Sequence, residues 1–107
     1  MKCKLHYSTD AIRDLDEIWD YILTELSNPS AAEKVVNQIM DKALQLEEFP
    51  RKGALLSSVT SMITDYRFLV SGNYLMFYRI EGNDVYIDRV LYDRRDYLRI
   101  LFGSPKE

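Results

Sequence analysis

The residues of this chain that could do chemistry are arginines and tyrosines in its second half. Six of the eight arginines and six of the eight tyrosines lie after residue 65. A guanidinium group binds phosphate or carboxylate oxygens with paired hydrogen bonds, and a phenol can donate a proton. The candidate catalytic or target-binding residues are therefore Arg67, Arg89, Tyr92, Arg94, Arg95 and Tyr97, with Lys52 as a candidate phosphate contact.

Each candidate also has a structural alternative. Arg67 and Arg89 alternate with apolar residues, so they could simply pair with neighbouring aspartates on a solvated strand face. Tyr92 and Tyr97 are open to either interpretation, and the alternative for Lys52, which we favour, is a solvated lysine. Arg94 and Arg95 favour function, because we expect them to open a helix, where cations oppose the helix dipole.

No cofactor or metal is expected. His6 is the only histidine and Cys3 the only cysteine, and neither has a partner at ligand spacing. A single cysteine forms no disulfide within the chain and suits a reducing cytoplasm, where we expect the protein. No apolar run approaches the length that spans a membrane, and the first residues lack the apolar core of a signal peptide.

The composition is that of one soluble domain covering residues 1–107. The hydrophobic fraction is 47%, and 14 basic against 17 acidic residues give a net charge of -3. Because non-specific binding to nucleic acid depends on many cations, this balance argues against a protein that coats bare nucleic acid. The local arginine cluster still fits an anion or an acidic partner.

The first half reads as a strand followed by two helices. Lys2–Tyr7 alternates as a short strand does, and Ser8 is a good N-cap for a helix that ends near Ser27. Asn28 and Pro29 start the next helix, which runs through about Glu47. Almost no linker separates the helices, so we expect an antiparallel hairpin.

Three strands follow a loop that ends at Asp65 and that has room for a short helical turn around Ser57–Met62. They span about Tyr66–Val70, Tyr74–Ile80 and Val85–Leu91, with glycine-containing turns between them. The connections are too short for crossovers, so the strands are antiparallel neighbours. The middle strand is apolar on both faces, so both faces should be covered, one of them by the helical hairpin.

The chain should end in a short helix over Asp93–Phe102, capped by Asp93 and ended by Gly103. The expected order is therefore β-α-α-β-β-β-α. This order predicts an α+β fold in which a helical hairpin packs on an antiparallel sheet, and the short C-terminal helix covers part of the other face.

This order and these residues resemble the RelE/ParE superfamily, the toxins of bacterial type II toxin–antitoxin pairs. The resemblance covers nearly the whole chain. It rests on the segment from Ala11 to Ile22, on Leu46–Pro50, on Tyr66-Arg67, on Tyr74–Ile80 and on Val85–Tyr97.

The resemblance implies a toxin of a plasmid-stabilisation type module that arrests growth when its antitoxin is degraded. It also implies a hetero-oligomer in which the antitoxin's C-terminal segment wraps the toxin. Two mechanisms occur in the superfamily. ParE-like members poison DNA gyrase, whereas RelE-like members are metal-independent endoribonucleases that cleave mRNA on the ribosome.

Two departures from the RelE-like pattern weaken the nuclease interpretation. Leu75 follows Tyr74, where RelE-like nucleases commonly have arginine, and Tyr92-Asp93 stands where many members have His-Gly. A phenol, with an ordinary pKa of about 10, is a poor base at neutral pH. We therefore favour the gyrase mechanism, with the RelE-like nuclease and an inactive, antitoxin-binding module as alternatives.

Overall fold

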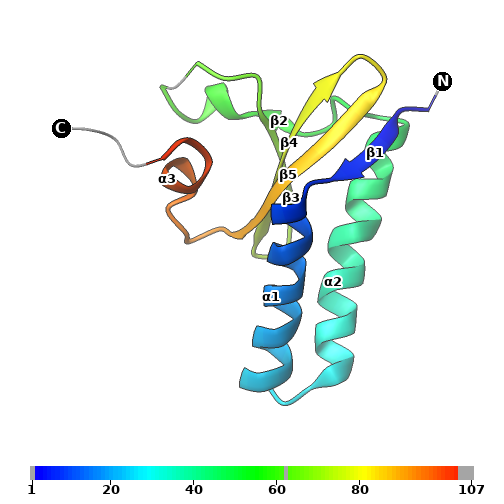
Figure 1. Ribbon diagram of the computed structural model, residues 1–107, viewed down its shortest axis with the longest axis vertical. Helices are drawn as coiled ribbons and strands as arrows, with labels where there is room; N and C mark the ends of the chain where they lie inside the picture. Colours follow the sequence, from blue (N-terminus) through cyan, green and yellow to red (C-terminus); the bar gives the residue numbers. More distant parts are fainter. Residues whose placement is uncertain (1, 62, 104–107) are drawn as a thin grey trace.

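The computed structural model describes residues 2–61 and 63–103, and this part of the chain forms helices packed on a five-stranded sheet (Figure 1). The expected α+β class and order of helices and strands are confirmed, with one short strand and two 3₁₀ turns added. The elements are β1 (Lys4–Tyr7), α1 (Thr9–Glu25), α2 (Pro29–Leu44), η1 (Gln45–Glu47), β2 (Ala54–Leu55), η2 (Leu56–Ser58), β3 (Arg67–Ser71), β4 (Tyr74–Glu81), β5 (Asp84–Tyr92) and α3 (Tyr97–Phe102).

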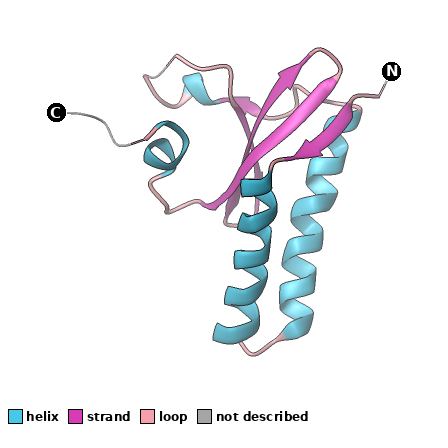
Figure 2. Ribbon diagram, viewed as in Figure 1, coloured by secondary structure: helices cyan, strands magenta, loops and turns pink. Residues whose placement is uncertain are grey.

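The helical hairpin forms as its capping residues predict. The Ser8 hydroxyl accepts a hydrogen bond of 2.9 Å from the backbone N–H of Ala11, and the Asn28 side chain accepts one of 3.1 Å from that of Ala31. These bonds satisfy backbone donors that have no partner inside the helix. Figure 2 shows α1 and α2 lying side by side and running in opposite directions.

The strands lie in the order β1-β5-β4-β3-β2. The meander from β3 to β5 is antiparallel as expected, but the sheet as a whole is mixed because β1 pairs with β5 in parallel. The long route from β1 through both helices makes this pairing possible. A β-bulge interrupts the β4–β5 ladder, where Phe77 faces Arg89 and Tyr78 faces Ile87, so that Asp88 is the extra residue.

Both faces of β4 are covered, as its apolar pattern predicts. Met76 and Tyr78 are fully buried in the core beneath the helical hairpin. Phe77, from the opposite face, is fully buried with Leu56 and Leu91 beneath residues of α3. The sheet is therefore a central layer between the hairpin and α3.

The C-terminal helix is shorter than expected. α3 spans Tyr97–Phe102, and its cap is Asp96, whose carboxylate accepts a hydrogen bond of 3.4 Å from the Arg99 N–H. The predicted cap at Asp93 is wrong because Asp93 lies in a turn, where its N–H bonds to the Asn73 carbonyl. Gly103 ends the helix with a φ of 82°, as expected.

The segment before β3 is more ordered than the loop that the sequence suggests. Ala54–Leu55 pairs with β3 as an edge strand, and η2 follows it over Leu56–Ser58. The helical turn expected around residues 57–62 partly falls on Met62, which lies outside the described residues. Among the described helices, none has both the length and the apolar character needed to span a membrane.

Candidate functional site

Arg89 is bound within the fold. Its Nε and Nη2 donate hydrogen bonds of 2.8 Å to the two carboxylate oxygens of Asp14 in α1. These bonds raise the pKa of Arg89, and burial opposes the shift. Asp14 is buried and accepts a third bond, of 2.9 Å, from the N–H of Val90. A charged pair with this many bonds fastens α1 to β5 and leaves Arg89 little freedom to bind a ligand.

Arg67 is also used by the fold. Its Nη1 donates to the carbonyls of Gly53 at 2.8 Å and Arg51 at 3.3 Å, both in the loop after η1. The same loop is held by Tyr78, whose hydroxyl donates to the Pro50 carbonyl and accepts from the Gly53 N–H, each at 2.8 Å. Burial raises the pKa of Tyr78, so its phenol stays neutral and available for both bonds.

A third polar cluster, on the α3 side of the sheet, was missed by sequence reasoning. Asp88, the extra residue of the bulge, accepts hydrogen bonds from Arg79 at 2.9 Å and from the Tyr66 hydroxyl at 2.7 Å. The Arg79 guanidinium also pairs with Glu81 and lies 4.7 Å from the ring centre of Tyr86. Arg79 and Glu81 are two residues apart on β4, so the sequence places their side chains on one face of the strand. The bulge that brings Asp88 to Arg79 has no recognisable signal in the sequence.

Burial and the hydrogen bond to Asp88 raise the pKa of Tyr66 to about 12. Burial also raises the pKa values of Tyr7, Tyr74 and Tyr78. These phenols therefore stay protonated at neutral pH, where none of them can accept a proton as a general base.

Tyr92 is the last residue of β5, Arg94 and Arg95 lie in the turn before α3, and Tyr97 is the first residue of α3. Arg94 and Arg95 do not open the last helix, as the sequence suggested, so the argument from the helix dipole does not apply. Both are exposed, and Tyr92 is 39% exposed. Tyr97 differs from the other three, because it is half-buried and its ring lies 5.1 Å from that of Phe77. It therefore packs in the second core.

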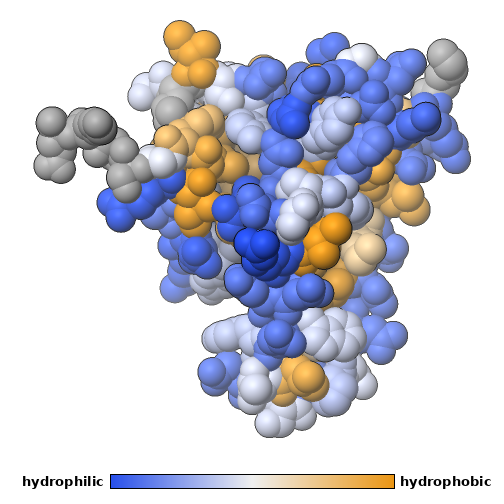
Figure 3. Space-filling model, viewed as in Figure 1, coloured by the Kyte–Doolittle hydropathy of each residue, from blue (hydrophilic) through white to orange (hydrophobic). Residues whose placement is uncertain are grey.

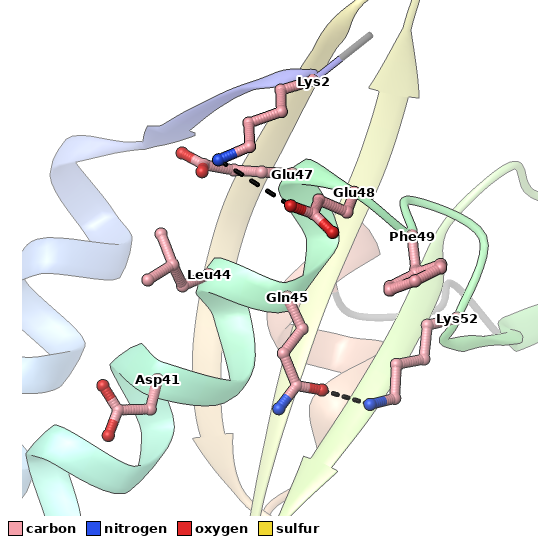
Figure 4. Close-up of a pocket in the computed structure, with 8 residues that line it drawn as sticks. All are labelled: Lys2, Asp41, Leu44, Gln45, Glu47, Glu48, Phe49 and Lys52. Carbon is pink, nitrogen blue, oxygen red and sulfur yellow. Dashed lines mark hydrogen bonds and ion pairs between the residues drawn. The ribbon is translucent and has the colours of Figure 1, made fainter.

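Lys52 lies at the edge of a hollow of about 330 Å³ at the end of α2 (Figure 4). Its ammonium donates to the Gln45 side chain, and Lys2 on the same rim pairs with Glu48 at 3.7 Å. Exposed Leu44 and Phe49 complete the lining together with Asp41 and Glu47. The hollow is lined by charged residues of both signs, so its cations do not converge to form a phosphate-binding site.

The sole histidine lies apart from these groups. His6 in β1 is 2.8 Å from an Asp84 oxygen and stacks on Tyr86, with ring centres 4.8 Å apart. Within residues 2–61 and 63–103, no three histidine, cysteine, aspartate or glutamate side chains come together as metal ligands would. The candidate arginines therefore do not form one cluster: Arg67 and Arg89 are bound to separate partners, while Arg94 and Arg95 remain exposed on a turn.

The family model described as ParE toxin of type II toxin-antitoxin system, parDE, matches residues 5–97. Curated protein sequences give no match. A chain of the chromosomal ParDE toxin–antitoxin system from P. aeruginosa is similar in structure, with a TM-score of 0.72 and 25% identity, over 85% of this chain and 96% of that chain. A chain of the toxin–antitoxin complex RelBE2 from Mycobacterium tuberculosis shares the fold, with a TM-score of 0.64 and 21% identity, over 86% of this chain and 99% of that chain.

Proposed function

The chain belongs to the family of ParE toxins of type II toxin–antitoxin systems, and we propose that it arrests bacterial growth by binding and poisoning DNA gyrase. In this proposal the toxin acts in the cytoplasm, needs no cofactor and is itself no nuclease. The observation that carries the proposal is the bidentate hydrogen bonding of Arg89 to Asp14, which commits a candidate phosphate-binding arginine to the fold.

RNA cleavage without a metal needs a base for the 2′-hydroxyl, a cation for the scissile phosphate and an acid for the leaving oxygen. Arg67 and Arg89 are both bound by acceptors of this chain. His6 pairs with Asp84 at the edge strand β1. This distribution supports a binding mechanism over catalysis.

An antitoxin partner is the second part of the proposal. Figure 3 shows apolar side chains gathered over α3 and at the neighbouring loop after η2. Exposed large apolar residues in these segments are Val59, Ile63 and Phe102. Exposed apolar groups of this kind are typical of surfaces that a partner covers. We propose that the C-terminal segment of a cognate antitoxin covers them in a hetero-oligomer, because the matching family is that of toxins from toxin–antitoxin systems and the similar ParDE chain comes from such a system.

The experiment is inducible expression in a bacterium, followed by pulse labelling of DNA and protein synthesis. Gyrase poisoning predicts an early fall in DNA synthesis, double-strand breaks and an SOS response while translation continues. The purified toxin should inhibit supercoiling by gyrase and leave ribosome-bound mRNA intact in a purified translation system.

Cleavage of mRNA in that system, with supercoiling unaffected, would instead establish the RelE-like mechanism. Unimpaired growth after induction would leave an inactive module that only binds its antitoxin. Co-purification with the product of a neighbouring small reading frame, and relief of growth arrest by that product, tests the antitoxin separately.

A further inference from the structure

Three tyrosines from separate elements and two arginines from one turn define a surface at the end of the sheet where β4 begins and β5 ends. We name it the tyrosine–arginine corner: Tyr21 of α1, Tyr74 of β4, Tyr92 of β5, and Arg94 and Arg95 of the following turn. Tyr74 and Tyr92 are directly paired across the β4–β5 ladder. The corner therefore combines the residue types that carry most binding energy at protein interfaces.

The aromatic part of the corner is unusually accessible. Tyr21 is 61% exposed and Tyr92 39% exposed, although the β-sheet and hairpin cores bury other tyrosines of this chain, such as Tyr78. The rings of Tyr74 and Tyr92 meet edge to face with centres 5.8 Å apart. Burial raises the pKa of Tyr74, and the phenols of Tyr92 and Tyr21 add to this shift, which indicates that the three groups are near one another.

The turn that carries the arginines is held in place. The Asp93 N–H donates to the Asn73 carbonyl at 2.8 Å, and the Arg95 N–H donates to the Tyr92 carbonyl at 3.0 Å. On its far side, Tyr97 packs on Phe77 in the second core. Binding to a turn that is already ordered costs less conformational entropy than binding to a mobile loop.

The two arginines of the corner differ from most others in the chain. Arg13, Arg79, Arg89 and Arg99 all pair with carboxylates of the protein. In the part of the chain that the structure describes, Arg94 and Arg95 pair with none, and both are exposed. Their guanidinium groups are therefore available to an acidic partner.

We infer that the tyrosine–arginine corner is the surface by which this toxin docks on gyrase, and that it receives an acidic segment of the gyrase protein, with carboxylates meeting Arg94 and Arg95 and an apolar or aromatic side chain packing on Tyr21 and Tyr92. This inference rests on the proposed function. It adds Tyr21 and Tyr74 to the candidate residues and specifies the chemistry of the segment that they meet.

The occupant is a protein segment rather than the DNA that gyrase carries. A duplex presents a long array of phosphates and needs many cations along the binding surface. The corner offers two cations that have no ion-pair partner in residues 2–61 and 63–103, exposed Asp93 is next to Arg94 in the sequence, and the whole chain has a net charge of -3. A short acidic segment satisfies two arginines without bringing further phosphates against these carboxylates.

The test compares corner variants with matched controls in binding to purified, DNA-free gyrase and in inhibition of supercoiling. The corner variants are Tyr21→Ala, Tyr92→Ala and the double variant Arg94→Glu/Arg95→Glu. The aromatic control is Phe49→Ala, because Phe49 is 63% exposed against 61% for Tyr21. The charge control is Arg13→Glu/Arg51→Glu, because both arginines are exposed and lie outside the corner.

We expect each single tyrosine variant to weaken gyrase binding by about tenfold and the charge-reversal variant to weaken it further, with controls close to the wild type. Melting temperature and affinity for the antitoxin should be preserved in every corner variant. Binding of the corner variants that equals the wild type would overturn the inference while leaving the gyrase mechanism in place.

The other outcomes are separable. A wild-type toxin that neither binds nor inhibits gyrase overturns the proposed function and this inference together. Corner variants that lose only antitoxin affinity identify the corner as the antitoxin's surface and overturn the inference alone. Wild-type binding to a DNA duplex without gyrase, lost in the charge-reversal variant, would assign the corner to nucleic acid and also overturn it.

Discussion

The carboxylate of Asp14 in α1 accepts two hydrogen bonds of 2.8 Å from the guanidinium of Arg89 in β5, which lies 75 residues later in the sequence. The same carboxylate accepts the Val90 N–H at 2.9 Å. β1 pairs with β5 only as far as Ile87, so Asp14 replaces the missing strand neighbour just beyond the end of β1. One side chain thus joins the helical hairpin to the sheet and supplies the acceptor for a backbone N–H of β5.

Replacing Asp14 by alanine should therefore destabilise the fold strongly. The substitution leaves the Arg89 charge and the Val90 N–H without their acceptor in a largely buried position, which costs about 3 kcal/mol or more. Urea denaturation of the purified variant and wild type measures the loss. The control is Asp16→Ala, an exposed carboxylate of the same helix, which should stay within about 0.5 kcal/mol of the wild type. Equal stability of the two variants would contradict the structural role of the pair.

Gly53→Ala should also destabilise the protein, because the new methyl group has no room. A Cβ at this position would lie 2.6 Å from both the Phe68 carbonyl and the Tyr78 hydroxyl. Moving Tyr78 would break its bonds to Pro50 and Gly53, so we expect a loss of about 1–3 kcal/mol. Thermal unfolding measures it, and Lys52→Ala in the same loop is the control. A melting temperature unchanged by Gly53→Ala would show that the loop rearranges freely.

The pKa of Tyr66 predicts a stability change at high pH. The folded protein keeps this phenolic proton up to about pH 12, whereas an unfolded chain releases it near pH 10. The contribution of this proton to stability is therefore fully present below about pH 10 and is lost as the pH rises toward about 12.

Tyr66→Phe should accordingly show a smaller fall in unfolding free energy than the wild type between about pH 10 and pH 12. Urea denaturation at several pH values measures that fall. Spectrophotometric titration of Asp88→Asn should show a lower pKa for Tyr66 than in the wild type, because that variant loses the carboxylate that helps raise the pKa. Identical pH profiles for Tyr66→Phe and the wild type would refute the assignment.

His6→Ala should leave growth arrest intact. The imidazole faces Asp84 and stacks on Tyr86 at the β1 edge of the sheet. The pair with Asp84 is partly exposed, so its contribution to stability is small. Toxicity after induction, scored at matched protein levels, tests this expectation. Loss of toxicity with an unchanged melting temperature would point to a histidine-dependent reaction and against the binding mechanism.

The capping and periodicity of the sequence predicted much of the fold. Ser8 and Asn28 start their helices as expected, because capping is decided by side chains within three residues of the helix start. The alternation in β4 predicted two apolar faces, and Met76 and Phe77 lie in separate cores, since side chains alternate along any strand. The prediction that Asp93 caps the last helix is wrong, because Asp93 lies in a turn where its N–H donates to the Asn73 carbonyl of a different turn.

The candidate site was less predictable. Sequence reasoning grouped Arg67, Arg89, Arg94 and Arg95 because they share a residue type and a region of the chain. The structure separates them: Arg67 bonds to backbone carbonyls of the loop after η1, Arg89 bonds to Asp14, and the last two have no carboxylate partner among the described residues. The phenol of Tyr21, far from Tyr74 in the sequence, contributes to the raised pKa of Tyr74, after burial and Tyr92.

By itself, the sequence determined the helical hairpin, the three-stranded meander and the family resemblance, because helix caps, turns and periodicity are local properties of the chain. Only the tertiary structure decided that β1 joins β5 in parallel, that a bulge turns Asp88 toward Tyr66 and Arg79, and that Asp14 occupies Arg89. The physical reason is that a side chain's bonding partner depends on which distant segments meet in space. No local pattern encodes whether an arginine will be bound by its own fold or left free for another molecule.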